Sequence, residues 1–124
     1  MARRRCEFTE LAEADLAEIA LYIAADSPKI ALRFVAELRR HCHLLTEHPA
    51  RNRLREEYGA GVRVAVHGKY LIFYVERGSA IVIERILHGS RHLDWIEGRL
   101  VIRPALRSVR TYTRSARRPG SGPG

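Results

Sequence analysis

The apolar residues of this chain change their spacing once, near residue 61, and that change limits the folds the chain can adopt. Before it, apolar side chains recur every three or four residues, as on the buried stripe of an amphipathic helix. After it they alternate or run continuously, as in β-strands. The chain has 124 residues, which is the size of one domain. We therefore expect an α+β fold with helices first and strands second.

Two helices are expected in the first half of the chain. The first should run from residue 10 to residue 25 with Thr9 as its N-cap, because a threonine hydroxyl accepts from the free N–H groups of a first turn. The second should begin at Ser27-Pro28, since proline at the first helical position lacks only an N–H that would be unpaired there. Pro49 should end it. The short connection between the helices predicts an antiparallel helical hairpin.

Three strands are expected after the polar loop at 49–61, over 62–67, 70–75 and 80–87, joined by glycine-containing turns. Glu7-Phe8 is a candidate short first strand, and a short helix is expected over 91–97. Together these elements predict a helical hairpin packed on one face of a small antiparallel sheet.

The second and third of these strands are apolar on both faces. A half-solvated antiparallel sheet should instead alternate apolar and polar residues, and two helices cover only one face. The other face must therefore meet the short C-terminal helix or another chain. A protein partner is the economical interpretation.

The positive charge is concentrated at the C-terminal end. The net charge is +8, and seven arginines with no acidic residue lie in 98–124, so the first 97 residues are almost neutral. The body therefore lacks the electrostatic footprint of a nucleic-acid-binding domain. The end segment is rich in proline and glycine, so we expect one folded domain at 1–97 and a disordered tail at 98–124. Nucleic-acid binding through the arginines of the tail is one functional hypothesis.

Several classes of protein are excluded by what the sequence lacks. Cys6 and Cys42 form no CxxC motif, and no His/Cys spacing is typical of a zinc site, so neither a metal nor a cofactor is expected. No apolar run approaches the ~18 residues that span a bilayer. The arginines at the N-terminus are not followed by an apolar stretch, so we expect no signal peptide, no membrane association and a cytoplasmic protein.

Several short runs stand in a fixed order along residues 6–96. They are Ala12-Glu13-Ala14-Asp15-Leu16 with Ile19 and Tyr22-Ile23, then Ala31 and Phe34, Pro49, Gly68-Lys69-Tyr70-Leu71-Ile72-Phe73-Tyr74, and Arg85-Ile86-Leu87-His88-Gly89-Ser90-Arg91. This ordered set resembles the ParE branch of the RelE/ParE toxins of bacterial type II toxin–antitoxin (plasmid stabilisation) modules. The resemblance implies a toxin that is held in a hetero-oligomer by a ParD-like antitoxin.

The resemblance implies two alternative targets. ParE-type toxins act on DNA gyrase and hold it in a DNA-cleaved state, whereas RelE-type toxins are endoribonucleases that cut mRNA on the ribosome. RelE-type cleavage needs a cluster of cations and a general base. Here Arg63, His88 and Arg91 are the candidates for that chemistry, but the other expected cations fall at Ala65 and Leu71, which cannot hold a phosphate. The gaps favour the gyrase-directed interpretation, with no enzymatic activity, and leave the endoribonuclease as the alternative.

The resemblance also suggests binding residues, each with a plainer structural role as the alternative. The candidates for antitoxin binding are Tyr70, Ile72, Tyr74, Arg85 and Leu87, and those for target binding are Arg91 and Trp95. Tyr70 and Tyr74 are equally consistent with core aromatics, and Arg85 with a structural cation paired to the neighbours of Glu84 or to Glu76 across the turn. His88 is also consistent with a hydrogen-bonding residue at a strand end.

Overall fold

The computed structural model describes residues 4–90, 92–96 and 99–103. The chain divides into two units, residues 1–89 and residues 90–124. The first unit holds, in order, β1 (Arg5–Phe8), α1 (Glu10–Ala24), α2 (Pro28–Leu44), the 3-10 turns η1 (Pro49–Arg51) and η2 (Glu56–Tyr58), β2 (Arg63–His67), β3 (Tyr70–Arg77) and β4 (Ala80–His88).

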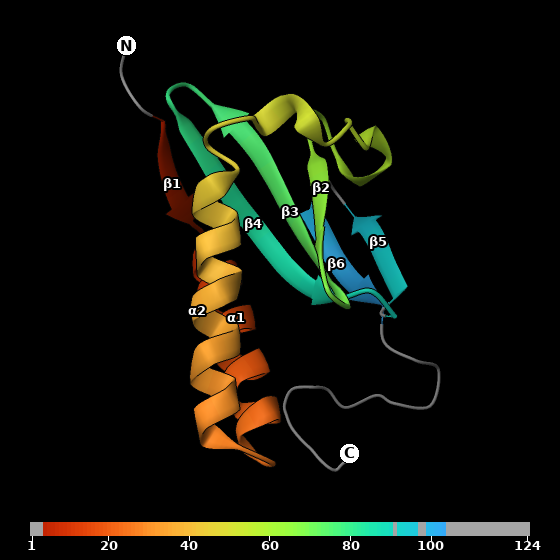
Figure 1. Cartoon of the computed structure of the whole chain (residues 1–124). Helices are drawn as coiled ribbons and strands as arrows, with labels where there is room; N and C mark the ends of the chain where they lie inside the picture. Colours follow the sequence, from red (N-terminus) through yellow and green to blue (C-terminus); the bar gives the residue numbers. More distant parts are fainter. Residues whose placement is uncertain (1–3, 91, 97–98, 104–124) are drawn as a thin grey trace. The chain divides into compact units, whose positions relative to one another are not determined.

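Both predicted helices are present and both begin at the predicted caps. The Thr9 hydroxyl accepts from the backbone N–H of Ala12 at 3.0 Å, and the Ser27 hydroxyl accepts from that of Ile30 at 3.2 Å. α2 ends at Leu44, earlier than the predicted stop at Pro49, and the chain continues through tight turns into η1. The helices lie side by side as the predicted hairpin, as Figure 1 shows.

The sheet has four strands in the order β1-β4-β3-β2. β2, β3 and β4 form the predicted antiparallel meander, whereas β1 runs parallel to β4. The prediction of a purely antiparallel sheet is therefore wrong for β1. The reason is that both helices separate β1 from the rest of the sheet in sequence, so no tight turn forces it to run antiparallel to its neighbour.

The main core lies between the helical hairpin and one face of this sheet. Its buried residues are Ala12, Leu16, Ile19, Leu38, Cys42, Leu45, Ala65, Ile72, Tyr74, Ile81, Ile83 and Ile86. The other face carries Phe73 and Leu87, which are also buried, and the Tyr58 ring stands edge-on to Phe73 with ring centroids 5.2 Å apart. Phe73 and Leu87 on this face are thus buried in the folded chain, while Val66 on the same face stays exposed.

The second unit contains β5 (His92–Ile96), which pairs antiparallel with β6 (Arg99–Arg103). The helix predicted over 91–97 is therefore wrong, and so is the expectation of disorder over 99–103. Leu93, Trp95 and Ile96 suit a strand as well as a helix, and pairing with the apolar run Leu100-Val101-Ile102 decides between the two. The rest of the predicted tail, 104–124, lies outside the described residues, and the domain boundary at 97/98 stays a prediction.

None of the helices in the described part of the chain is long and apolar enough to cross a lipid bilayer.

Candidate functional site

An ion pair between α1 and β4 anchors the helical hairpin to the sheet. Arg85 donates from Nε and Nη2 to the two carboxylate oxygens of Asp15, at 2.8 and 2.9 Å. The same carboxylate accepts from the backbone N–H of Ile86 at 2.9 Å. Arg85 is thus a structural cation, but its partner is Asp15 and not the predicted Glu76.

The pair sits at a β-bulge in β4. Phe73 is paired with Arg85 and Tyr74 with Ile83, so Glu84 is an extra residue without a partner on β3. The Thr9 hydroxyl donates to the Glu84 carbonyl at 2.9 Å, while Asp15 satisfies the N–H of Ile86. Side chains at the start of α1 therefore bind backbone groups that the bulge frees from the ladder.

A second polar network joins the sheet to η1. The Tyr74 hydroxyl donates to the Pro49 carbonyl at 2.7 Å and accepts from the Asn52 amide at 3.1 Å. Arg63 donates to the Asn52 carbonyl at 2.7 Å and lies 4.0 Å from a Glu76 carboxylate oxygen. Burial raises the pKa of the Tyr74 phenol, so its hydroxyl stays protonated and able to donate.

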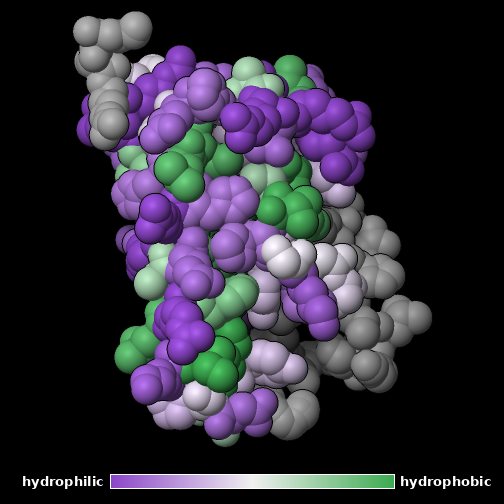
Figure 2. Space-filling model, viewed as in Figure 1, coloured by the Kyte–Doolittle hydropathy of each residue, from purple (hydrophilic) through white to green (hydrophobic). Residues whose placement is uncertain are grey.

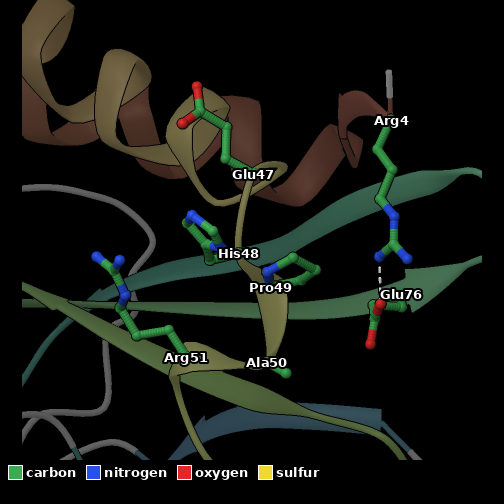
Figure 3. Close-up of a pocket in the computed structure, with 7 residues that line it drawn as sticks. All are labelled: Arg4, Glu47, His48, Pro49, Ala50, Arg51 and Glu76. Carbon is green, nitrogen blue, oxygen red and sulfur yellow. Dashed lines mark hydrogen bonds and ion pairs between the residues drawn. The ribbon is translucent and has the colours of Figure 1, made fainter. Parts of the chain in front are cut away.

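A shallow open pocket of about 510 Å³ lies beside this network. It is lined by Arg4, Glu47, His48, Pro49, Ala50, Arg51 and Glu76. Figure 3 shows Arg4 pointing to Glu76, with which it forms an ion pair. The pocket mixes both signs of charge, so it does not present the uniformly positive lining that a phosphate ligand needs.

Histidines and aromatic rings gather where β2 ends and β3 begins. His41 on α2 lies with its Nδ1 atom 2.8 Å from Nδ1 of His67. Phe34 packs edge-on to His67 and tilted against Tyr70, with ring centroids 5.5 and 5.6 Å apart. The Tyr70 ring is in turn edge-on to His88 at 5.3 Å. Sequence reasoning missed the pairing of His41 with His67, because 26 residues separate the two.

The candidate cleavage residues do not form a catalytic cluster in the part of the chain that the structure describes. Arg63 is engaged by Asn52 and Glu76, and His88 packs on Tyr70. Arg91 lies outside the described residues, and the side chain of Trp95 is likewise not described. Ala65 is buried in the core and Leu71 is half-buried, as apolar residues should be.

The candidate antitoxin-binding residues are placed mainly inside the fold. Ile72 and Tyr74 are fully buried beneath the helices, and Leu87 is buried on the opposite face. Tyr70 is half-buried against Phe34, and Arg85 is held by Asp15. In this structure the burial of Ile72, Tyr74 and Leu87 leaves them no surface to offer a partner.

Exposed apolar side chains lie instead on the two helices, and three of them are on α1. Leu21 and Tyr22 are 73% and 78% exposed, and Leu11 is also exposed. Leu11, Glu18, Leu21 and Tyr22 are spaced by three, four and seven residues, which places them on one face of the helix. Figure 2 shows apolar surface over the lower part of the helical pair, where α1 ends and α2 begins. The sequence could have revealed this exposed face, since its residues lie outside the apolar stripe of α1 that packs on the sheet.

Among the described residues, no group of three or more His, Cys, Asp or Glu side chains is arranged to hold a metal ion. Both cysteines are free thiols. Burial raises the pKa of Cys6 to about 11, with the charge of Glu7 adding to the effect, and raises that of Cys42 to about 12. Neither thiol is therefore an activated nucleophile.

The fold and sequence agree with known toxins. The sequence model of the "ParE toxin of type II toxin-antitoxin system, parDE" matches residues 6–93, and the chain belongs to this family. The structure resembles a chain of the chromosomal ParDE toxin–antitoxin system from P. aeruginosa, with a TM-score of 0.61 and 24% identity over 69% of this chain and 96% of that chain.

A chain of the toxin–antitoxin complex RelBE2 from Mycobacterium tuberculosis is also similar. Its TM-score is 0.53, with 25% identity over 70% of this chain and 99% of that chain. None of the curated proteins compared with the chain matches it. The resemblance drawn from the ordered sequence runs is confirmed.

Proposed function

We propose that this chain is a toxin that acts on DNA gyrase and that a cognate antitoxin neutralises it. The observation that carries the proposal is the match to the ParE toxin family over residues 6–93. The placement of the candidate cleavage residues supports it. A ribosome-dependent nuclease needs cations free to bind the scissile phosphate, and Arg63 is already bound to Asn52 and Glu76.

The gyrase proposal is tested by adding the purified chain to gyrase and relaxed circular DNA. We expect supercoiling to fall and linear DNA to appear after denaturation and proteolysis, as the toxin traps the cleaved intermediate. Normal supercoiling without cleaved DNA at excess chain would overturn the proposal.

A matched experiment in cells separates the two targets. Induced expression in a bacterium that carries a DNA-damage reporter should arrest growth and activate the reporter. Arrest with a silent reporter and codon-phased cuts in mRNA, lost on His88→Ala, would establish the endoribonuclease instead.

We also propose that the antitoxin contacts the exposed face of α1. Large apolar side chains gathered on a solvent-exposed helix are typical of protein interfaces. Leu11, Leu21 and Tyr22 provide such a surface. The sheet residues predicted for this role are buried or partly buried, so at most Tyr70 and Arg85 would add to the contact.

The surface is tested with Leu21→Lys, a change that the exposed last turn of α1 should tolerate. We expect affinity for the antitoxin encoded beside this chain to fall at least about tenfold, the equivalent of ~1.4 kcal/mol. Val66→Lys is the matched control, because Val66 is 64% exposed but lies on β2. Equal affinities of both variants and the unmodified chain would refute this surface.

A further inference from the structure

The distance between the imidazole rings of His41 and His67 determines which protonation states the pair can adopt. Their Nδ1 atoms are 2.8 Å apart, which is a hydrogen bond between ring nitrogens. A neutral imidazole has one nitrogen that donates and one that accepts, whereas a protonated imidazole only donates. One Nδ1 atom must therefore carry a hydrogen and the other must be bare. The contact admits a pair with no charge or one charge, and it excludes a pair with two.

The position of this pair in the fold gives the proton count a structural consequence. His41 lies in the last two turns of α2, and His67 is the last residue of β2, immediately before the turn at Gly68. Gly68 has a φ of 61°, which glycine adopts without strain. The hydrogen bond therefore ties the second helix to the tip of the β2–β3 hairpin.

The neighbourhood offers little to stabilise a second positive charge. Phe34 packs edge-on to His67 from α2. The titratable or charged residues nearest to the pair along the chain are Glu37 and Arg40 on α2 and Lys69 in the turn, and Tyr70 and His88 adjoin it through the Phe34 ring. Glu37 lies one helical turn before His41 but is exposed, so solvent screens its attraction to a charged imidazole ring. Burial, followed by the positive charge of His67, lowers the pKa of His41.

We propose that His41 and His67 form an acid-sensitive latch, which fastens α2 to the β2–β3 hairpin and opens when both rings are protonated. At neutral pH the shared hydrogen holds the rings together. In acid each ring carries its own proton, so two donors and two charges face each other and the contact is lost. Tyr70 and His88, which adjoin the latch through Phe34, then lose part of their packing.

The latch goes beyond the proposed function, because it concerns how firmly this end of the sheet is held and not what the toxin binds. Its test therefore needs neither gyrase nor an antitoxin. A failure of the gyrase proposal leaves the latch intact, and a failure of the latch leaves the gyrase proposal intact.

The protonation of the rings is tested first on the unmodified full chain by NMR of isotope-labelled histidines. At pH 7.5 we expect one of the two rings to carry its hydrogen on Nδ1 and the other ring to have a bare Nδ1 atom. Hydrogen exchange is measured in parallel at pH 7.5 and pH 5, with rates corrected for the intrinsic pH dependence. The backbone amides of residues 37–44 and 64–71 should lose at least about tenfold of their protection in acid. A change of one pKa unit in one coupled protonation corresponds to a factor of about ten.

Two variants and one control make the exchange experiment specific. His67→Gln and His41→Gln each remove one ring and keep a polar side chain, so their acid-induced loss of protection should be less than about threefold. His48→Gln removes an exposed histidine outside the latch and should behave like the unmodified chain. Two rings that both carry their hydrogen on Nε2 at pH 7.5 overturn the latch, as does an equal loss of protection in all four proteins.

Discussion

Asp15 and Arg85 are joined by two charge-assisted hydrogen bonds, although 70 residues separate them in the chain. Their side chains are only 8% and 13% exposed. The carboxylate also accepts from the backbone of Ile86 beside the bulge, so one acidic residue fixes the position of α1 on β4. The pair thus joins the first helix directly to the strand at the centre of the sheet.

Removing the carboxylate should therefore destabilise the fold strongly. We expect Asp15→Ala to lower the free energy of unfolding by about 3–5 kcal/mol, because Arg85 is left with an unpaired charge and Ile86 with an unpaired N–H. Urea denaturation measures the change. Glu13→Ala is the control, since it breaks the exposed pair with Arg39, which should cost about 1 kcal/mol or less. Similar losses in the two variants would contradict the anchoring role.

The Tyr74 hydroxyl should contribute measurably to stability. In Tyr74→Phe the Pro49 carbonyl and the Asn52 amide both lose their partner. We expect a loss of about 1–2 kcal/mol in the free energy of unfolding, measured by urea denaturation. Tyr22→Phe, at an exposed position on α1, should change it by less than about 0.5 kcal/mol. An unchanged free energy of unfolding in Tyr74→Phe would show that this network does not hold η1 to the sheet.

Stability should fall as the pH is lowered through the histidine range. The pKa of His41 is below its usual 6.5 in the folded chain, first because of burial and then because of His67. Below pH 6.5 the unfolded chain therefore binds more protons than the folded chain, and acid favours unfolding. We expect the melting temperature to drop between pH 7 and pH 5, and to drop less in His41→Gln. A drop of the same size in this variant would assign the pH dependence to other groups.

The two thiols should be unreactive while the chain is folded. Their raised pKa values, about 11 for Cys6 and about 12 for Cys42, leave almost no thiolate at neutral pH. Modification by a thiol reagent should be slower in buffer than in urea by about 100-fold for Cys6 and about 1000-fold for Cys42, since each pKa unit removes about 90% of the thiolate. Ala36→Cys, at an exposed site on α2, provides a reactive control. Fast labelling of Cys42 in buffer would reveal opening of the core.

Local signals predicted much of the first unit. Thr9 and Ser27-Pro28 act on the residues just after them, so the starts of both helices were readable from the sequence. The turn at Gly68 was readable for the same reason. The residues over 91–97 were misread because their pattern suits either a helix or a strand, and only the partner strand Arg99–Arg103 decides.

The candidate site was less predictable, because it depends on pairs far apart in the sequence. Simple alternation placed Tyr70, Ile72 and Tyr74 together on one face, which is correct, but could not say that the helices cover that face. The bulge at Glu84 shifts the register within β4 and brings Ile83 and Ile86 into the same core, three residues apart. No periodic pattern predicts such an insertion.

The sequence by itself determined the order of the elements, their caps and turns, and the ordered runs that mark a ParE-type toxin, because each of these is written in residues close together along the chain. The tertiary structure alone decided that β1 runs parallel to β4, that Asp15 is the partner of Arg85, and that His41 meets His67. Each is a contact between segments that the chain brings together only on folding, and the free energy of burial selects it from many pairings that the local sequence allows.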